Sequence, residues 1–247
     1  MTISEAVNWS EFILLTVPGV REPEQYSALA SQLGAGAEGK VIIDATNPLA
    51  PYPALDIFWD GNKSAGELLQ AALPKSFVYK GFNTVGLGHL GNPDGSQITG
   101  GRDTSLGPLK MLFCGSADRH EQAAQVIAGV GFQPLYVGPI RYSRNLEAIA
   151  ELWIHLAIPG VGSPEEWGFG FHFEPTGIGG GSGSNAGSQT IVKKVDSSIK
   201  STSSNSYRIA IIGRGEVGLA LARCLIRNGW SVQFGSRNPD EVCLIII

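Results

Sequence analysis

The segment "RIAIIGRGEVG", residues 208–218, constrains the fold of this chain more than any other stretch. An apolar run typical of a buried strand leads into glycines with the spacing G-x-G-x-x-G, and a helical apolar pattern follows. In this pattern Gly213 permits a tight turn, Gly215 lets a phosphate approach the backbone, and Gly218 lets helix and strand pack closely. The first N–H groups of the helix favour an anion. The segment therefore predicts a dinucleotide-binding turn. The other residues that we assign to cofactor contact are Arg214, Glu216 and Val217.

The end of the next predicted strand selects between the two nicotinamide dinucleotides. Sites for NAD place Asp or Glu there to bind the ribose 2′-hydroxyl, whereas Arg suits a 2′-phosphate. Here "SVQFGS" is followed by Arg237, and no acidic residue occurs before Asp240. A guanidinium binds phosphate through two donors, and a carboxylate would repel it. We therefore expect NADP(H), held by Ser236, Arg237 and Asn238. The alternative is that Arg237 is only a solvated loop charge.

Short apolar runs alternate with helical patterns along the chain. Strands separated by helices of about 10–15 residues indicate βαβ units and a mostly parallel sheet covered on both faces. We expect an α/β, Rossmann-like, doubly wound fold with a small C-terminal-type helical or α/β extension. The predicted strands are 12–17, 41–44, 77–82, 111–114, 135–137, 208–212 and 231–234. The predicted helices are 23–33, 64–73, 119–130, 142–156 and 217–228.

Residues 176–206 differ from their surroundings, because they are rich in Gly and Ser and nearly free of large apolar side chains. Such a composition does not offset the entropy lost on ordering, so we expect a linker. It separates residues 1–175 from residues 207–247. The first part is expected to be the nucleotide-binding domain without its first βαβ unit, together with a substrate-side extension. The second part is expected to supply the missing unit.

Composition and charge exclude several classes of function. With 43% apolar and 16% charged residues the chain is globular, and a net charge of −4 without a basic run argues against nucleic acid as a partner. No basic leader precedes the apolar run "FILLTV", which is far too short to span a bilayer, so we expect a cytoplasmic protein without membrane contact. Cys114, Cys224 and Cys243 lack metal-ligand spacing, which indicates a reducing compartment and no metal.

Several longer stretches resemble the NADP oxidoreductase family that uses the 8-hydroxy-5-deazaflavin coenzyme (factor 420), which includes the reductase domain of the six-transmembrane ferric reductases. They are "IAIIGRGEVGLALA" with "FGSRNP", "SEAVNWSEFILLTVP", "GKVIIDATNPL", "FVYKGFNTVG", the segment from "MLFCGS" to "LWIHLA", and "WGFGFHF". Together they cover about residues 2–174 and 207–239. The resemblance implies an NADP-dependent oxidoreductase that passes hydride between the nicotinamide and a deazaflavin, or an ordinary flavin such as FMN or FAD.

The order of these stretches differs from that of the family, in which the glycine turn comes first and residues like "FGFHF" come last. Two explanations fit: a circular permutation, which is tolerated where chain ends lie close together at the surface, or a window cut from a tandem protein. The family places a helix between "SRNP" and "SEAV", where this chain has only "DEVCLIII" and "MT". The tail 243–247 either pairs as the third strand of the sheet or remains an exposed apolar end.

The resemblance also places site residues at the carboxyl ends of the central strands, where ligands bind in open parallel sheets. In the family, the stretches that match "LLTVPG" and "DATNPL" lie along the ribose and nicotinamide, with the Asn47 amide able to orient the carboxamide. The turn "KGFNTVG" lies near the point of hydride transfer. The residues carried over are Thr16, Val17, Pro18, Thr46, Asn47, Pro48, Phe82, Asn83 and Thr84. Each Pro has the alternative role of ending its strand.

Residues 86–95 are expected to form a mobile Gly-rich flap, in which His89 is either a catalytic acid or a solvated side chain. An apolar stripe on the 142–156 helix predicts either core packing or a homodimer surface. The stripe consists of Leu146, Ile149, Leu152, Trp153 and Leu156. His155 on the same helix is expected to be packed or exposed rather than functional.

Direct hydride transfer between nicotinamide and a deazaflavin needs neither a nucleophile nor a metal, and the sequence shows no triad or Cys/His cluster that would supply one. The partner is then a small-molecule electron donor or acceptor. Two alternatives stay open. A reductase of a small carbonyl or imine needs a proton donor at the nicotinamide, for which Lys80 and Tyr52 are the candidates. A non-catalytic NADP(H)-binding module needs none.

Overall fold

The computed structural model describes residues 1–51, 54–57, 63–94, 107–157 and 207–239. The strands are β1 (Phe12–Leu15), β2 (Val41–Asp44), β3 (Phe77–Lys80), β4 (Lys110–Gly115), β5 (Gln133–Tyr136), β6 (Arg208–Ile212) and β7 (Ser231–Gly235). The helices are α1 (Ile3–Trp9), α2 (Pro23–Leu33), α3 (Ala65–Ala72), α4 (Leu87–Gly91), α5 (His120–Val130), α6 (Ser143–Ala157) and α7 (Glu216–Arg227), with 3₁₀ turns at Ala35–Ala37 and Ile140–Tyr142.

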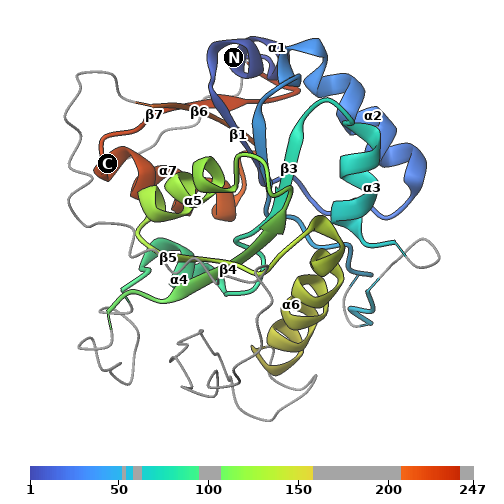
Figure 1. Ribbon diagram of the computed structural model, residues 1–247, viewed down its shortest axis with the longest axis vertical. Coiled ribbons are helices and arrows are strands. Elements are labelled where there is room, and N and C mark those ends of the chain that lie inside the picture. The colour runs from blue at the N-terminus through green and yellow to red at the C-terminus, as the bar shows by residue number, and fades with distance from the viewer. Residues whose placement is uncertain (52–53, 58–62, 95–106, 158–206, 240–247) are drawn as a thin grey trace, which may run out of the picture.

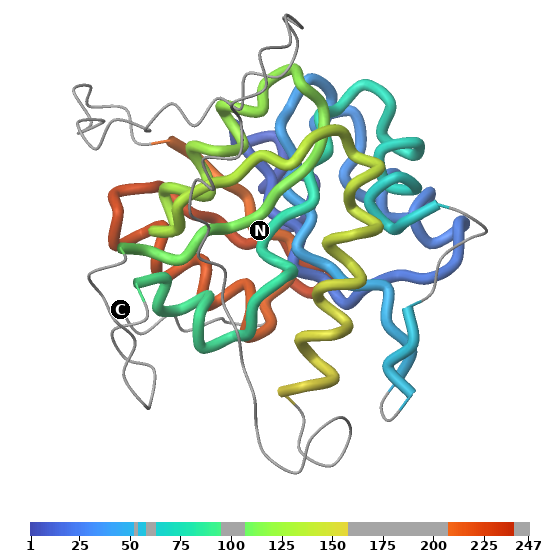
Figure 2. The backbone as a smooth tube through the Cα atoms, turned by 60° about the horizontal axis from the view of Figure 1, so that its bottom comes forward, coloured from blue at the N-terminus to red at the C-terminus, as the bar shows by residue number. Residues whose placement is uncertain are grey.

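These strands form one sheet with the order β5-β4-β3-β2-β1-β6-β7. Neighbouring strands are parallel except β3 and β4, which are antiparallel. β6, from the end of the chain, pairs with β1, from its beginning, so that Phe12 lies opposite Ile209 and Leu15 opposite Ile212. Figure 1 shows the red β6 and β7 beside the blue β1, and Figure 2 shows the same red segment packed into the body of the protein.

The central strands are apolar throughout because helices cover both faces of the sheet. Alternate residues of a strand point to opposite faces. Leu14 and Ile211 lie in a core cluster with α5 and α7, whereas Ile13 and Ala210 lie in a second cluster with α1, α2 and α3. Residues of both clusters are almost completely buried. The fold is therefore α/β and Rossmann-like with a mostly parallel, doubly wound sheet, which confirms the predicted fold class.

The chain begins with a helix that the sequence analysis does not include. Thr2 caps α1, since its hydroxyl accepts a hydrogen bond from the Glu5 N–H at 3.2 Å and the Glu5 carboxylate accepts one from the Thr2 N–H at 2.8 Å. This T-x-x-E capping box was the available signal. Thr2 also forms a parallel bridge with Ser236, whose N–H donates to the Met1 carbonyl at 3.2 Å. The start of the chain thus lies at the sheet edge beyond β7, while the tail 243–247 lies outside the described residues.

Two other local expectations are corrected by the structure. β1 ends at Leu15 and β3 at Lys80, so Val17 and Phe82 lie in the loops that follow these strands. Within the predicted flap 86–95, residues 87–91 form helix α4, because Leu90 is buried in the core cluster that also contains residues of α7. Position 95 lies outside the described residues.

Strands β4 and β5 continue the sheet beyond β3, and α6 follows them in the chain. β4 turns back against β3, and α6 packs Leu146 on Leu112 and Cys114 of β4. Along the predicted stripe, Leu146 and Ile149 contact this cluster, whereas Leu152 is 49% exposed. No helix of the described residues is both long and apolar enough to cross a lipid bilayer.

Candidate active site

The glycine turn after β6 has the geometry that each of its glycines predicts. Gly213 has φ +115°, a conformation that side chains disfavour, and a Cβ there would lie 2.7 Å from the Thr16 carbonyl oxygen. A Cβ on Gly218 would lie 2.7 Å from the Gly213 carbonyl oxygen. A Cβ on Gly215 would meet nothing within 4 Å. Gly213 and Gly218 are therefore required by the fold, whereas Gly215 leaves space beside the backbone that the fold does not use.

The start of α7 supports anion binding at this turn. Gly215 is its N-cap and offers no side-chain hydrogen bond to the first N–H groups. These groups and the positive end of the helix dipole suit a phosphate. The Val217 side chain packs against the core, and Glu216 is exposed in the first turn, so both residues offer the turn their backbone rather than a side chain.

Thr16 fixes the turn to the end of β1. Its hydroxyl lies 3.2 Å from the Gly213 carbonyl oxygen and 3.3 Å from that of Ile212, and its N–H donates to the Ile212 carbonyl at 2.9 Å. The site therefore depends on a contact between the two distant parts of the chain.

A cavity of about 800 Å³ opens beside this turn. Its size falls within the range of about 300–1,000 Å³ that is usual for small-molecule sites. Of the predicted residues, those that line it are Val17, Pro18, Gly213, Arg214, Ser236, Arg237 and Asn238. The wall also includes Ile3 of α1 and four residues of α2 (Gln25, Ala28, Leu29 and Gln32), and the sequence analysis assigned none of these to the site.

Two arginines lie on the cavity wall with different roles. Arg214 donates a hydrogen bond to the Asn238 carbonyl at 3.0 Å, and the Asn238 N–H donates to the Ser236 hydroxyl at 3.1 Å. Arg214 therefore helps to hold the loop after β7. The Arg237 side chain is exposed and forms no ion pair with the described residues, so its guanidinium is available to an anion in the cavity.

The strand ends beyond Pro18 form a second group, which we call the rim: residues 46–48 and 83. A Cβ on Gly19 would overlap the Asn47 carbonyl oxygen, so the loop that borders the cavity lies directly against the rim. The Asn83 side-chain NH₂ donates to the Asn47 side-chain oxygen and to the Leu146 carbonyl, both at 3.1 Å. Thr46 and Pro48 are buried.

The Asn83 side-chain oxygen is buried and has no hydrogen-bond partner among the described residues. Leaving such an acceptor unpaired costs about 1–3 kcal/mol. Asn83 is therefore not optimised for stability, although its NH₂ group donates two hydrogen bonds.

Phe82 and Thr84 contribute less to the rim than the sequence predicts. Phe82 is 1% exposed, and its ring packs 6.2 Å from that of Phe132 in the core. The Thr84 side chain is fully buried, with its hydroxyl 3.9 Å from the Met111 sulfur. Both side chains are buried, so only their backbone can face a ligand. Phe82 has φ +63°, a costly conformation for a bulky residue that recurs at functional sites.

His89 lies on α4, half-buried, with its ring 6.3 Å from that of Trp153 and nearly perpendicular to it. Trp153 itself covers Gly86, where a Cβ would overlap the indole. His89 thus packs against α6. Within the described ranges, no group of three or more His, Cys, Asp or Glu could hold a metal ion.

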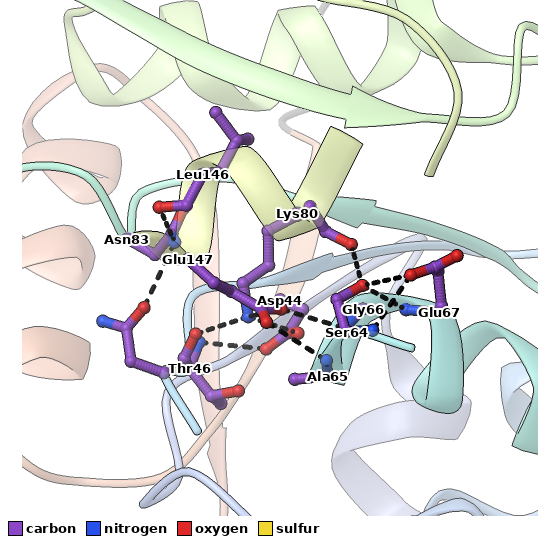
Figure 3. A network of polar contacts seen from close by, with 12 residues as sticks. Asp44, Thr46, Ser64, Ala65, Gly66, Glu67, Lys80, Asn83, Leu146 and Glu147 are labelled. Atoms are coloured by element: carbon purple, nitrogen blue, oxygen red, sulfur yellow. Dashed lines mark hydrogen bonds and ion pairs between the residues drawn. The ribbon is translucent and has the colours of Figure 1, made fainter. Parts of the chain in front are cut away.

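A buried charge cluster lies beneath the rim, as Figure 3 shows. The Lys80 ammonium lies 2.9 Å from an Asp44 oxygen and 3.5 Å from a Glu147 oxygen, and all three side chains have no exposed surface. Burial alone would lower the pKa of Lys80, but the two carboxylates outweigh burial and raise it above its ordinary value. Lys80 is therefore protonated and fully paired at neutral pH.

The cluster also holds the backbone around it. Lys80 donates to the Thr46 carbonyl at 2.5 Å, and the Thr46 N–H donates to Asp44 at 2.9 Å. Glu147 accepts hydrogen bonds from the N–H groups of Ala65 and Gly66, at 3.2 and 3.1 Å, at the start of α3. The sequence signal was a charged residue at the end of each apolar strand, "VIID" and "FVYK", although nothing in it identified Glu147 as their partner.

The chain is similar in sequence to part of a known reductase. No protein-family model matches it. Over 146 residues, or 59% of this chain, it is 29% identical to the metalloreductase STEAP3 of Rattus norvegicus. The matched region is 26% of the length of that protein, so this chain corresponds to about a quarter of its relative.

The fold is similar to that of a solved bacterial protein. A crystal structure from Arthrobacter sp. FB24, of a candidate F420-dependent NADP reductase, matches with a TM-score of 0.52 and 22% identity, over 63% of this chain and 67% of that one. At this identity the likeness shows the fold alone. A hypothetical protein from Sinorhizobium meliloti matches with a TM-score of 0.46 and 22% identity, over 57% of this chain and 62% of that one.

Proposed function

We propose that this protein is an NADP(H)-dependent oxidoreductase that transfers hydride between the nicotinamide and a deazaflavin coenzyme (factor 420) or a flavin such as FMN or FAD. The observation that carries the proposal is the glycine turn, which leaves space only at Gly215 and borders a cavity that contains Arg237. The similarity to a metalloreductase and to the fold of a candidate F420-dependent NADP reductase supports the same class of reaction.

The residues divide the binding task between the glycine turn, the cavity beside it and the rim. The turn at Gly215 and the first N–H groups of α7 would hold the pyrophosphate, and Ser236, Arg237 and Asn238 the 2′-phosphate. Pro18 and the rim would border the nicotinamide. The cofactor supplies the hydride chemistry, so the protein needs to orient the ring and exclude water. The rim suits this task because buried hydrogen bonds hold its backbone in place.

The geometry does not favour a reductase of small carbonyls or imines. Lys80, one of its two candidate proton donors, is fully buried between two carboxylates and bonded to the Thr46 carbonyl. Tyr52, the other candidate, lies outside the described residues. A non-catalytic NADP(H)-binding module remains an outcome of the experiment below.

We also propose that residues 1–175 and 207–247 form one nucleotide-binding domain in circularly permuted order, with 176–206 as the linker. The pairing of β6 with β1 and the contacts of Thr16 with Gly213 support this organisation. The parallel bridge between Thr2 and Ser236 supports it as well, because it places the start of the chain beside the end of β7.

The first test measures the dissociation constants of NADPH and NADH for the wild type and for Arg237→Ala. Loss of a charged hydrogen bond to the 2′-phosphate should weaken NADPH binding roughly 10- to 100-fold and leave NADH unchanged. Arg223→Ala is the matched control, because Arg223 is exposed on α7, the helix that follows the turn, but does not line the cavity. Equal losses of NADPH affinity in both variants would mean that binding depends only on the overall charge of the protein.

The second test follows NADPH oxidation with oxidised electron acceptors of different chemistry. Factor 420, FMN or FAD with a ferric chelate, and small carbonyls are compared at the same NADPH concentration. Turnover with a deazaflavin or flavin supports the proposal. Turnover with carbonyls alone replaces it with the second enzyme class, and tight NADPH binding without any turnover identifies a binding module.

A further inference from the structure

Two consecutive residues of α6 are connected to the rim from behind, Leu146 directly and Glu147 through Lys80, and neither belongs to the nucleotide-binding turn. The Leu146 carbonyl accepts a hydrogen bond from Asn83. The Glu147 carboxylate forms an ion pair with Lys80. Figure 3 shows both contacts on the same turn of this helix. One short stretch of α6 therefore reaches the rim by two separate routes.

The first route runs through a single side-chain amide. Asn83 uses the same NH₂ group to bond Leu146 and the Asn47 side chain. The orientation of this amide is determined, because both partners are oxygens and only its nitrogen can donate to them. The Asn47 oxygen is consequently engaged, and the Asn47 side chain is held in one orientation at the rim.

The second route runs through the charge cluster. Glu147 and Asp44 hold the Lys80 ammonium, which donates to the Thr46 carbonyl, and Asp44 accepts the Thr46 N–H. Both backbone groups of Thr46 are thus fixed from below. The two routes end at adjacent residues, Thr46 and Asn47, directly before the proline that completes the rim.

Other bonds attach α6 to α3 without reaching the rim. Arg144 forms a two-point ion pair with Glu67 at 2.7 and 2.8 Å on the partly exposed side of these helices. Ser143 and Ser64 share a short hydrogen bond nearby. Glu147 also bonds the Ala65 and Gly66 N–H groups of α3, whereas Glu67 attaches α3 to α6 without contacting Lys80 or Asn83, so a change at Glu67 tests the attachment alone.

We propose that Asn83 and Glu147 are positioning residues that set the rim for the nicotinamide ring, with α6 as the support behind it. This inference rests on the proposed function. Neither residue needs to touch the ring. Each acts through a neighbour, Asn83 through the Asn47 amide and Glu147 through the Lys80 bond to Thr46.

The test compares two ligands that differ only in the nicotinamide: NADPH and 2′-phospho-ADP-ribose. Glu147→Gln is the main variant, since it leaves Lys80 paired with Asp44 and so leaves no buried charge without a partner. We expect its Kd for NADPH to rise about tenfold and its Kd for 2′-phospho-ADP-ribose to change less than about twofold. Glu67→Gln is the matched control, with the same chemical change on the attachment that does not reach the rim, and should change neither Kd.

A second variant tests the other route and protects the experiment against misfolding. Asn83→Ser keeps a small polar side chain and removes the two hydrogen bonds to Asn47 and Leu146. It should therefore also weaken the binding of NADPH more than that of 2′-phospho-ADP-ribose. The single-turnover rate of hydride transfer from saturating NADPH to factor 420 or a flavin should fall at least tenfold in both variants. A displaced nicotinamide ring reacts slowly even when NADPH is bound.

The outcomes separate this inference from the function on which it rests. If the wild type binds neither ligand, the proposed function is wrong and the inference falls with it. If the wild type binds both ligands and the two variants weaken them equally, or match Glu67→Gln, then Asn83 and Glu147 only support the fold. The same conclusion follows if NADPH binding and hydride transfer are unchanged.

Discussion

The Thr16 hydroxyl lies 3.2 Å from the Gly213 carbonyl oxygen, although 197 positions separate the two residues in the chain. Thr16 follows β1, and Gly213 begins the glycine turn after β6. The same hydroxyl fills the space where a side chain on Gly218 would lie. The conformation of the turn is therefore set by a residue from the opposite end of the sequence.

Thr16→Val should weaken both the fold and cofactor binding. Valine has nearly the same shape but cannot bond the Gly213 carbonyl, so the free energy of unfolding should fall by about 1 kcal/mol. NADPH binding should weaken severalfold because the turn loses its side-chain hydrogen bond to this residue. Urea denaturation and fluorescence titration measure the two effects. Thr16→Ser keeps the hydroxyl and should behave like the wild type; if it resembles the valine variant, the hydrogen bond is unimportant.

Gly215→Ala and Gly218→Ala should separate binding from stability. A methyl group at Gly215 meets open space, so the free energy of unfolding should change by less than about 1 kcal/mol, while NADPH binding weakens about tenfold. A methyl group at Gly218 would overlap the turn, which should cost about 1–3 kcal/mol of stability. Thermal unfolding and ligand titration on both variants check this. Equal stability losses would contradict the assigned roles.

Cys114 should make the fold less stable in alkali. Burial raises the pKa of this thiol from 9.0 to about 12, against the opposing effect of the Lys80 charge. Below pH 9 both the folded and the unfolded chain hold the proton. Above it the unfolded chain releases the proton first, so stability is lost as the pH rises from 9 toward 12, by up to about 1.4 kcal/mol per pH unit.

The matched measurement is the difference in unfolding free energy between the wild type and Cys114→Ala at pH 7, 9 and 10.5. Tyr26 and Tyr79 also have raised pKa values, but Cys114 contributes to neither shift, so their effect is the same in both proteins and cancels in the difference. A difference that stays constant from pH 7 to 10.5 would show that the thiol does not contribute.

Hydrogen exchange should report the central place of β6. Ile211 and Leu14 face one another on adjacent strands and have no exposed surface, so their amides should exchange at similar rates, close to the rate set by global unfolding. Mass spectrometry of peptides from 208–212 and 12–15 provides the comparison. Much faster exchange in the 208–212 peptide would show that the last strands separate from the sheet on their own.

The sequence predicts the central strands well because their signal is local. The structure has β2, β6 and α2 at the predicted bounds, and the pairing of β6 with β1 follows from the order of the motifs. α1 and α4 were missed because each spans fewer than eight residues and carries little apolar periodicity. The reversed direction of β4 was also not predicted, since an apolar run reads the same in both directions.

The candidate site divides in the same way. The need for glycine at Gly213 and Gly218 could be predicted, because backbone geometry requires it at both positions, whereas the role of Gly215 in phosphate binding stays a prediction. The rim could not, because its organisation depends on Asn83, Lys80 and Glu147, which meet only when α6 packs behind the strands. Phe82 illustrates the limit. The sequence predicts it as the last residue of a strand, but not that the strand ends before it or that its ring lies in the core.

The cavity wall has a mechanical consequence, because Val17 and Pro18 come from one end of the chain and Arg214 and Arg237 from the other. A molecule bound between them joins both halves, so every contact it makes also resists their separation. A ligand concentration of a hundred times Kd would raise the free energy of unfolding by about 2.7 kcal/mol. Removal of the ligand should therefore lower the stability of the whole sheet, and a bound nucleotide would hold the first and last strands of the chain together reversibly.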